Sequence, residues 1–197
     1  FTELDCLNGQ RQLAQGQTAE GYATAEKLWL VGKSQPEACD RLFDRWAAEG
    51  QLTEQRRWQR AKLAAEARNY SLATLLSKNL PTLSNHGKLL VDVAQKPQML
   101  TQPARFTPAD DAMGDVVSLG LRRLARQDPE QALSLLEGYS QRMRFSEQEK
   151  VAIANEIGLT LARRFDPRAL DVMAKYDPNL RDDTVSEWRA RLLLRLS

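Results

Sequence analysis

Apolar residues recur along the chain at intervals of three and four, which places their side chains on one face of an α-helix. One such series is Ala132, Leu135, Leu136, Tyr139 and Met143. No stretch shows the convincing alternation of apolar and polar residues that a half-buried strand would need. The pattern therefore predicts an all-α chain.

Start and stop signals divide this pattern into about eleven helices. Asp128-Pro129 combines an N-cap acceptor with a proline at the first helical position. Ser146 with Glu149, and Thr184 with Glu187, each fit a capping box. The predicted helices span residues 3–15, 18–31, 36–49, 53–68, 70–79, 83–95, 109–127, 129–143, 146–164, 166–175 and 182–196.

Most links between these helices are short, so neighbouring helices should run antiparallel and form hairpins. Irregular hairpins of this kind usually stack into a superhelical solenoid with a concave face, here tetratricopeptide-like but without a strict repeat. We expect residues 1–197 to form a single domain of this type. Residues 96–108 carry three prolines and are predicted to run extended, which makes them the candidate for an internal boundary.

Composition narrows the classes of function. A hydrophobic content of 42% and a charged content of 27% are ordinary for a globular protein, and the net charge of +2 lacks the basic excess of a nucleic-acid binder. The sequence contains no apolar run long enough for a membrane span. The chain begins at Phe1 with polar and acidic residues, and we expect it to be a fragment or a processed product.

The sequence offers no coherent catalytic, cofactor-binding or metal-binding set. His86 is the single histidine, so neither a metal cluster nor a serine–histidine–aspartate triad is supported, and we expect it at the surface. Gly32-Lys33-Ser34 lacks the earlier glycine of a phosphate-binding loop, because Lys27 occupies that position. The pairs Asp110-Asp111 and Asp182-Asp183 stand at predicted helix starts, where capping explains them.

Aromatic and basic residues have structural and functional interpretations. Trp29, Trp46 and Trp188 lie on apolar stripes and are predicted to pack in the core, whereas Trp58 lies among arginines and should be partly exposed. The basic clusters are expected to form solvated helix faces, although they would also suit a groove that meets an anionic polymer. These clusters are Arg56-Arg57-Arg60, Arg122-Arg123-Arg126, Arg163-Arg164 and Arg189-Arg191.

Cys6 and Cys39 are the two cysteines of the chain. From the residues alone, a structural disulfide and a pair of buried free thiols remain equally open, because the first requires an oxidising compartment.

The block from Ala25 to Phe43 closely resembles the helical N-terminal region of the soluble lytic murein transglycosylases. Weaker similarity covers Ala104 to Leu136 and Glu147 to Arg164. The specific pattern in the first block consists of Leu28-Trp29-Leu30, Gly32-Lys33-Ser34-Gln35-Pro36, Ala38-Cys39-Asp40 and Leu42-Phe43.

This resemblance implies a U-shaped superhelix that forms part of a ring, with a linker and a lysozyme-like catalytic domain elsewhere in the protein. In that family, a glutamate within a Glu-Ser dipeptide cleaves peptidoglycan and leaves a 1,6-anhydro-muramic product. No Glu-Ser occurs in this chain, so no catalytic residue can be transferred. The resemblance also implies the periplasm of Gram-negative bacteria, and this compartment favours a Cys6–Cys39 disulfide.

The sequence therefore supports a non-catalytic scaffold segment of a periplasmic lytic transglycosylase. The expected partners are the linker and catalytic domains of the same protein and peptidoglycan, held weakly through a basic groove. No cofactor and no nucleic acid are expected. The alternative is a helical-repeat adaptor that binds other proteins, and an exposed apolar patch on its concave face would distinguish it.

Overall fold

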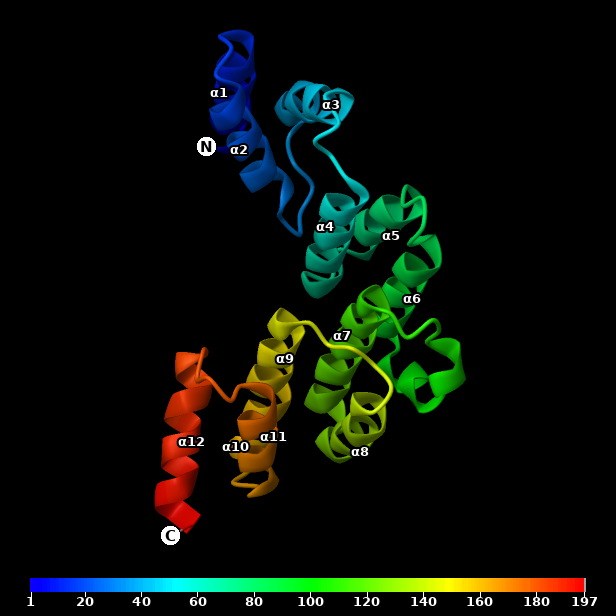
Figure 1. Ribbon diagram of the computed structural model, residues 1–197, viewed down its shortest axis with the longest axis vertical. Coiled ribbons are helices and arrows are strands. Elements are labelled where there is room, and N and C mark those ends of the chain that lie inside the picture. Colours follow the sequence, from blue (N-terminus) through cyan, green and yellow to red (C-terminus); the bar gives the residue numbers. More distant parts are fainter. Residues whose placement is uncertain (197) are drawn as a thin grey trace. The chain divides into compact units, whose positions relative to one another are not determined.

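The computed structural model describes residues 1–196, which contain helices, turns and loops but no β-strand. The predicted all-α class is thus confirmed. The chain divides into two compact units, one comprising Phe1–Val91 and the other starting at Asp92. The division falls inside helix α6 (Figure 1).

The first unit begins with a helical hairpin, continues through a short helical turn, and includes a second hairpin. The helices of each hairpin pack directly on one another, and the links between them are short, as the sequence predicts. The elements are α1 (Thr2–Ala14), α2 (Thr18–Trp29), η1 (Glu37–Cys39), α3 (Asp40–Ala48), α4 (Glu54–Glu66) and α5 (Tyr70–Lys78). Helix α6 (Ser84–Gln95) starts in the first unit and ends in the second.

The second unit is organised around its longest helix, α7 (Asp111–Gln127). This helix packs against the 3₁₀ segment before it and against α8 and α9 after it. The remaining elements are η2 (Pro97–Thr101), η3 (Pro103–Arg105), α8 (Pro129–Ser140), α9 (Glu147–Ile153), η4 (Ala154–Gly158), α10 (Leu159–Ala162), α11 (Arg168–Tyr176) and α12 (Asp183–Leu196).

Side-chain caps account for several helix starts. Asp110, Asp128 and Ser146 each accept a backbone N–H from three residues ahead, at 2.9, 3.0 and 3.1 Å. These N-caps were predicted and are confirmed. The predicted box at Thr184 is wrong, because Asp182 caps the last helix by accepting the Val185 N–H at 2.9 Å.

The proline-rich segment 96–108 is not extended, contrary to prediction. Pro97 and Pro103 start two short 3₁₀ helices, and Leu100 and Phe106 are fully buried. The Tyr139 hydroxyl donates to the Leu100 carbonyl oxygen at 2.8 Å, and the rings of Phe106 and Tyr139 meet edge to face. Proline fits the first position of such a turn because it has no N–H to leave unpaired. The segment therefore belongs to the core of the second unit.

The predicted helix 146–164 is interrupted by a π-helical turn, η4, between α9 and α10. The turn shifts the helical register, so the side chains that follow it are displaced around the helix axis. Gly158 closes the turn and lies against Met173 of α11, where an added Cβ would meet the Met173 Cγ at 2.8 Å. The periodicity of apolar residues carried no signal for this interruption.

Candidate functional site

The distinctive block around residues 25–43 forms an aromatic cluster in the first unit. The ring of Trp29 meets Phe43 edge to face at 5.1 Å and lies 6.1 Å from the ring of Trp46. All three residues are buried. Gly32 lies where a Cβ would meet the Leu63 carbonyl oxygen at 2.4 Å, so only glycine lets this loop approach α4 so closely. The uncommon residues of the block are therefore explained by packing.

Two arginines of α4 complete this cluster. The Arg60 guanidinium lies 4.2 Å from the Trp29 ring centroid and donates to the Lys33 carbonyl oxygen at 3.2 Å. Arg56 pairs with Glu26 at 2.8 Å. Arg60 is only 5% exposed, and burial lowers the pKa of its guanidinium. The expectation of a solvated basic face is thus wrong for Arg60, whose charge is held against aromatic rings.

The structure also corrects the expected exposure of His86 and two tryptophans. Trp58 is 1% exposed and His86 is 6% exposed, and their rings meet edge to face at 6.5 Å inside the first unit. Trp188 is only half-buried, with the Arg191 guanidinium 5.3 Å from its ring centroid. The prediction that Trp58 is partly exposed is therefore wrong. It rested on the arginines next to Trp58 in sequence, but successive side chains of a helix point in different directions.

Cys6 of α1 and Cys39 of η1 form a disulfide, with a Cα–Cα distance of 4.9 Å. Both cysteines are fully buried. The bond joins the first hairpin to the start of α3, as the resemblance implied.

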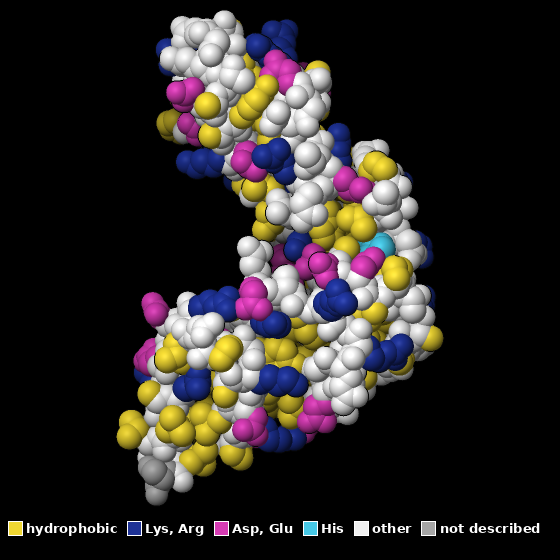
Figure 2. Space-filling model, in the orientation of Figure 1, with side chains coloured by type: hydrophobic (Ala, Val, Ile, Leu, Met, Phe, Trp, Pro, Cys, Tyr) yellow, Lys and Arg dark blue, Asp and Glu magenta, His cyan; other side chains and the backbone are white. Residues whose placement is uncertain are grey.

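In each acidic pair, the first aspartate caps a helix. Asp110 and Asp182 cap α7 and α12. Within residues 1–196, no group of three histidine, cysteine, aspartate or glutamate side chains is placed to hold a metal ion. No helix in the same range is long and apolar enough to cross a membrane. On the face seen in Figure 2, lysine and arginine side chains are interspersed with aspartate and glutamate.

An open hollow of about 520 Å³ with a basic lining lies beside the π-helical turn of the second unit. We call it the arginine hollow, and its lining residues are Arg126, Glu156, Thr160, Arg163 and Arg164. It brings together arginines from two of the predicted basic clusters, one on α7 and one at the end of α10.

Glu156 organises the hollow from within the π-helical turn. Arg126 donates to both of its carboxylate oxygens, at 2.8 and 2.6 Å. The hydrogen bond from Arg126 holds the Glu156 pKa below its usual value of 4.5, although burial opposes this shift. Arg163 and Arg164 are exposed, and neither forms an ion pair in the described part of the chain. The hollow therefore keeps two guanidinium groups available for an anion, and guanidinium suits carboxylates.

The soluble lytic murein transglycosylase of Escherichia coli K12 is 32% identical over 149 residues, which is 75% of this chain and 23% of that protein. The Salmonella typhimurium protein of the same name is 29% identical over 98% of this chain and 29% of its own length. The X-ray structure of an inactive mutant of lytic transglycosylase Slt from Pseudomonas aeruginosa matches the whole chain with 69% identity and a TM-score of 0.94, over 32% of its own chain.

The chain belongs to the soluble lytic murein transglycosylase family. A second solved structure, the 70-kDa soluble lytic transglycosylase in complex with bulgecin A, is 27% identical over 99% of this chain with a TM-score of 0.64. The chain spans between a quarter and a third of the length of most of these family members, and 23% of the Escherichia coli protein.

A model of the cucumovirus coat protein family matches residues 8–104. This range is less than half of the chain, crosses the division at Val91, and ends within η3. The transglycosylase matches instead follow the chain through both units, so we base the family assignment on them.

Proposed function

We propose that this chain is a non-catalytic helical scaffold segment of a lytic murein transglycosylase. In this proposal it forms part of a U-shaped superhelix and a ring, and it helps to position peptidoglycan strands. Cleavage with a 1,6-anhydro-muramic product would occur in another domain of the same protein, to which this segment is attached. The match of the whole chain to lytic transglycosylase Slt, at 69% identity, carries the proposal.

The arginine hollow is the proposed murein contact. Peptidoglycan presents peptide carboxylates, and Arg163 and Arg164 offer two guanidinium groups without ion-pair partners in residues 1–196. Because both side chains are exposed, the contact should be weak and should weaken further as salt screens the charges.

We also propose a periplasmic location in a Gram-negative bacterium. The buried Cys6–Cys39 disulfide supports it, because structural disulfides persist in oxidising compartments and are rare in the cytosol. No nucleic acid and no cofactor have a part in this proposal.

Co-sedimentation of the chain with purified peptidoglycan sacculi tests the proposal, with the supernatant analysed for anhydro-muropeptides. Binding without product release is the expected result. Release of anhydro-muropeptides by this chain would overturn the non-catalytic assignment.

The contact itself is tested with a double variant, Arg163→Gln with Arg164→Gln. We expect the bound fraction to fall about fivefold at low salt, as for two exposed charge contacts. The matched control is Arg11→Gln with Arg45→Gln, which makes the same change of charge on the first unit and should leave binding unchanged. Equal losses in both double variants would show non-specific attraction and refute the hollow as the contact.

The alternative is a helical-repeat adaptor for other proteins. It predicts that sacculi fail to bind the chain while a protein partner does. The arginine hollow favours the murein proposal, because its lining contains no apolar side chain larger than the methyl of Thr160.

A further inference from the structure

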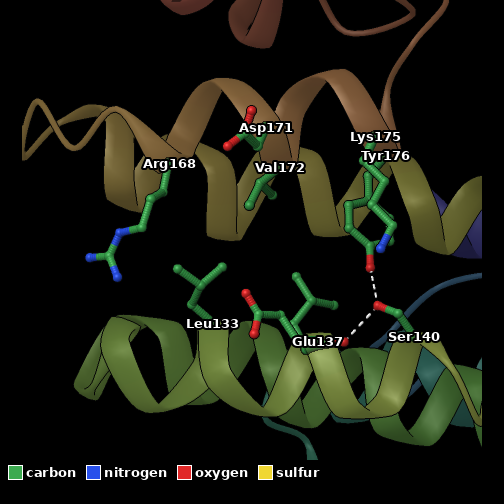
Figure 3. A pocket seen from close by; sticks show the side chains of 9 residues that line it. Leu133, Glu137, Ser140, Arg168, Asp171, Val172, Lys175 and Tyr176 are labelled. Carbon is green, nitrogen blue, oxygen red and sulfur yellow. Dashed lines mark hydrogen bonds between the residues drawn. The ribbon is translucent and has the colours of Figure 1, made fainter.

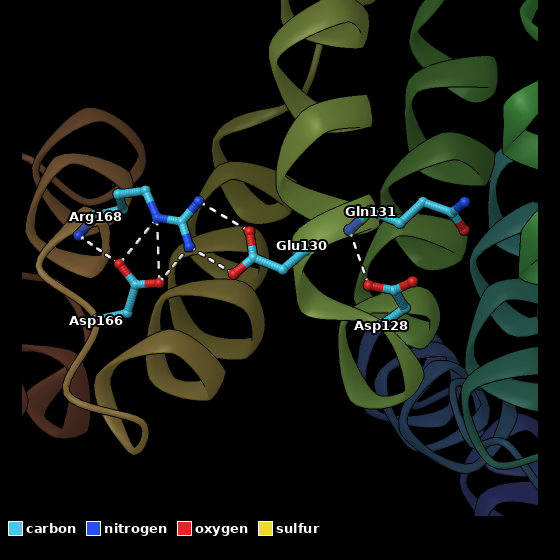
Figure 4. Close-up of polar contacts among 5 residues, drawn as sticks. All are labelled: Asp128, Glu130, Gln131, Asp166 and Arg168. Carbon is cyan, nitrogen blue, oxygen red and sulfur yellow. Dashed lines mark hydrogen bonds and ion pairs between the residues drawn. The ribbon is translucent and has the colours of Figure 1, made fainter.

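Helices α8 and α11 lie side by side in the second unit and are joined by polar contacts at both ends. At one end, Arg168 donates to both carboxylate oxygens of Glu130, at 2.9 and 2.5 Å, and also pairs with Asp166 (Figure 4). At the other end, the hydroxyl groups of Ser140 and Tyr176 are hydrogen-bonded (Figure 3). These two contacts link α8 to α11 at either end of a space that the side chains of the two helices leave unfilled.

A slot of about 160 Å³ remains between the two contacts. Its floor is apolar and consists of the buried side chains Leu133, Leu136 and Val172, with the ring of Tyr176. Pockets for drug-sized ligands measure about 300 Å³ or more, so this slot is too small for a sugar chain. It has room for several water molecules or for one extended side chain.

Two of the carboxylates that line the slot, Asp171 and Glu137, form no ion pair in residues 1–196. Arg168 is already held by Glu130 and Asp166. Lys175 of α11 also lines the slot, and its Nζ lies 5.4 Å from the Tyr176 ring centroid. Glu137 of α8 has no hydrogen-bond or ion-pair partner in the described chain, and Figure 3 shows its carboxylate reaching into the gap beside Leu133.

We propose that this slot binds the side chain of a lysine-type diamino acid within a peptide. The aliphatic stem lies along Leu133, Leu136 and Val172, and the terminal ammonium group pairs with Glu137. An apolar floor bordered by the unpaired carboxylates of Glu137 and Asp171 complements an alkyl chain that ends in a cation. This proposal is independent of the murein contact, because it uses a different surface and the opposite charge.

An anionic ligand fits the slot less well. It would have to displace Asp166 or Glu130 from Arg168, or draw Lys175 away from the Tyr176 ring, whose centroid lies 5.4 Å from the Lys175 Nζ. It would also approach the free carboxylate of Glu137.

The test titrates the ¹⁵N-labelled chain with Nα-acetyl-lysine methylamide and follows amide shifts in α8 and α11. The neutral probe Nα-acetyl-norleucine methylamide has the same stem without the ammonium group and should bind about tenfold more weakly. Nα-acetyl-glutamate methylamide should not bind. Equal binding of the lysine and norleucine probes, or preferred binding of the glutamate probe, would overturn the proposal.

Two variants locate the contact. Glu137→Gln keeps the shape of the side chain and should weaken binding of the lysine probe about tenfold, while leaving the norleucine probe unchanged. Val172→Phe fills the slot and should abolish binding of both probes. Glu187→Gln makes the same change of charge on exposed α12 and serves as the control. Wild-type affinity in Glu137→Gln would refute the assigned role of this carboxylate.

Discussion

Two glycines on packed helices of the second unit should respond in opposite ways to an added methyl group. At Gly114 of α7, a Cβ would come within 2.1 Å of the Arg144 carbonyl oxygen. At Gly138 of α8, nothing lies within 4 Å of such a Cβ. The first glycine permits a close backbone approach, whereas the second only weakens its helix.

Gly114→Ala should therefore lower the free energy of unfolding by about 1–3 kcal/mol, because the neighbouring backbone must move. Gly138→Ala should raise it by about 0.5–1 kcal/mol through helix propensity. Urea unfolding followed by circular dichroism measures both changes. An unchanged free energy of unfolding for Gly114→Ala would mean that the loop before α9 can move away from the added methyl group without loss of stability.

At the scale of elements, α4 ends with a residue in a left-handed conformation. Arg68 has a φ of 61°. The N–H groups of Arg68 and Asn69 donate hydrogen bonds to the carbonyl oxygens of Ala65 and Ala64, at 3.0 and 2.8 Å, and so end the helix. Glycine adopts this conformation without the steric cost that a Cβ brings.

Arg68→Gly should stabilise the chain by about 1 kcal/mol, seen as a higher urea midpoint. Arg68→Ala is the control, because it removes the same charged side chain but keeps the Cβ, and it should show no such gain. Equal gains in both variants would point to the loss of the arginine charge as the cause.

The disulfide links α1 to η1 across 33 residues of sequence. In the chain-entropy model, a loop of this length contributes roughly 3–4 kcal/mol to the free energy of unfolding. Reduction with dithiothreitol should therefore lower the urea midpoint of the wild-type chain. The variant Cys6→Ser with Cys39→Ser should match the reduced protein and should not respond to dithiothreitol.

The helices were predictable from the sequence where they depend on residues close to one another in the chain. Helix periodicity and the caps at Asp110, Asp128 and Ser146 placed most helices within a few residues. The π-helical turn escaped prediction because the apolar periodicity does not mark it, and the packing of Gly158 at its end against Met173 is a tertiary contact.

The candidate sites were less predictable for the same reason. The arginine hollow joins residues of α7 to residues of α10, and the slot joins α8 to α11. A sequence identifies each cluster of charges but not which clusters meet. The burial of Arg60 and Trp58 likewise depends on the helices that cover α4.

For the molecule as a whole, acid should weaken the fold through carboxylates in both units. Burial raises the pKa of Glu54, but hydrogen bonds from the N–H and hydroxyl groups of Thr82 and from the Leu83 N–H outweigh this effect, so the pKa is lowered. In the second unit, the pKa values of Glu147 and Glu156 are lowered by hydrogen bonds from Lys150 and Arg126.

A carboxylate with a lowered pKa in the folded state contributes stability that is present above its unfolded pKa and is lost as the pH falls through the folded value. The urea midpoint should thus stay nearly constant between about pH 7 and 5.5 and should decline below the ordinary glutamate pKa of 4.5. Arginine and lysine remain protonated throughout this range, so the decline reports the acidic partners. Glu54→Gln keeps an acceptor for the two N–H groups without the titrating charge, and its midpoint should fall less steeply than that of the wild type. A midpoint that is constant from pH 7 to 3.5 would show that the contacts of these carboxylates contribute nothing to folding.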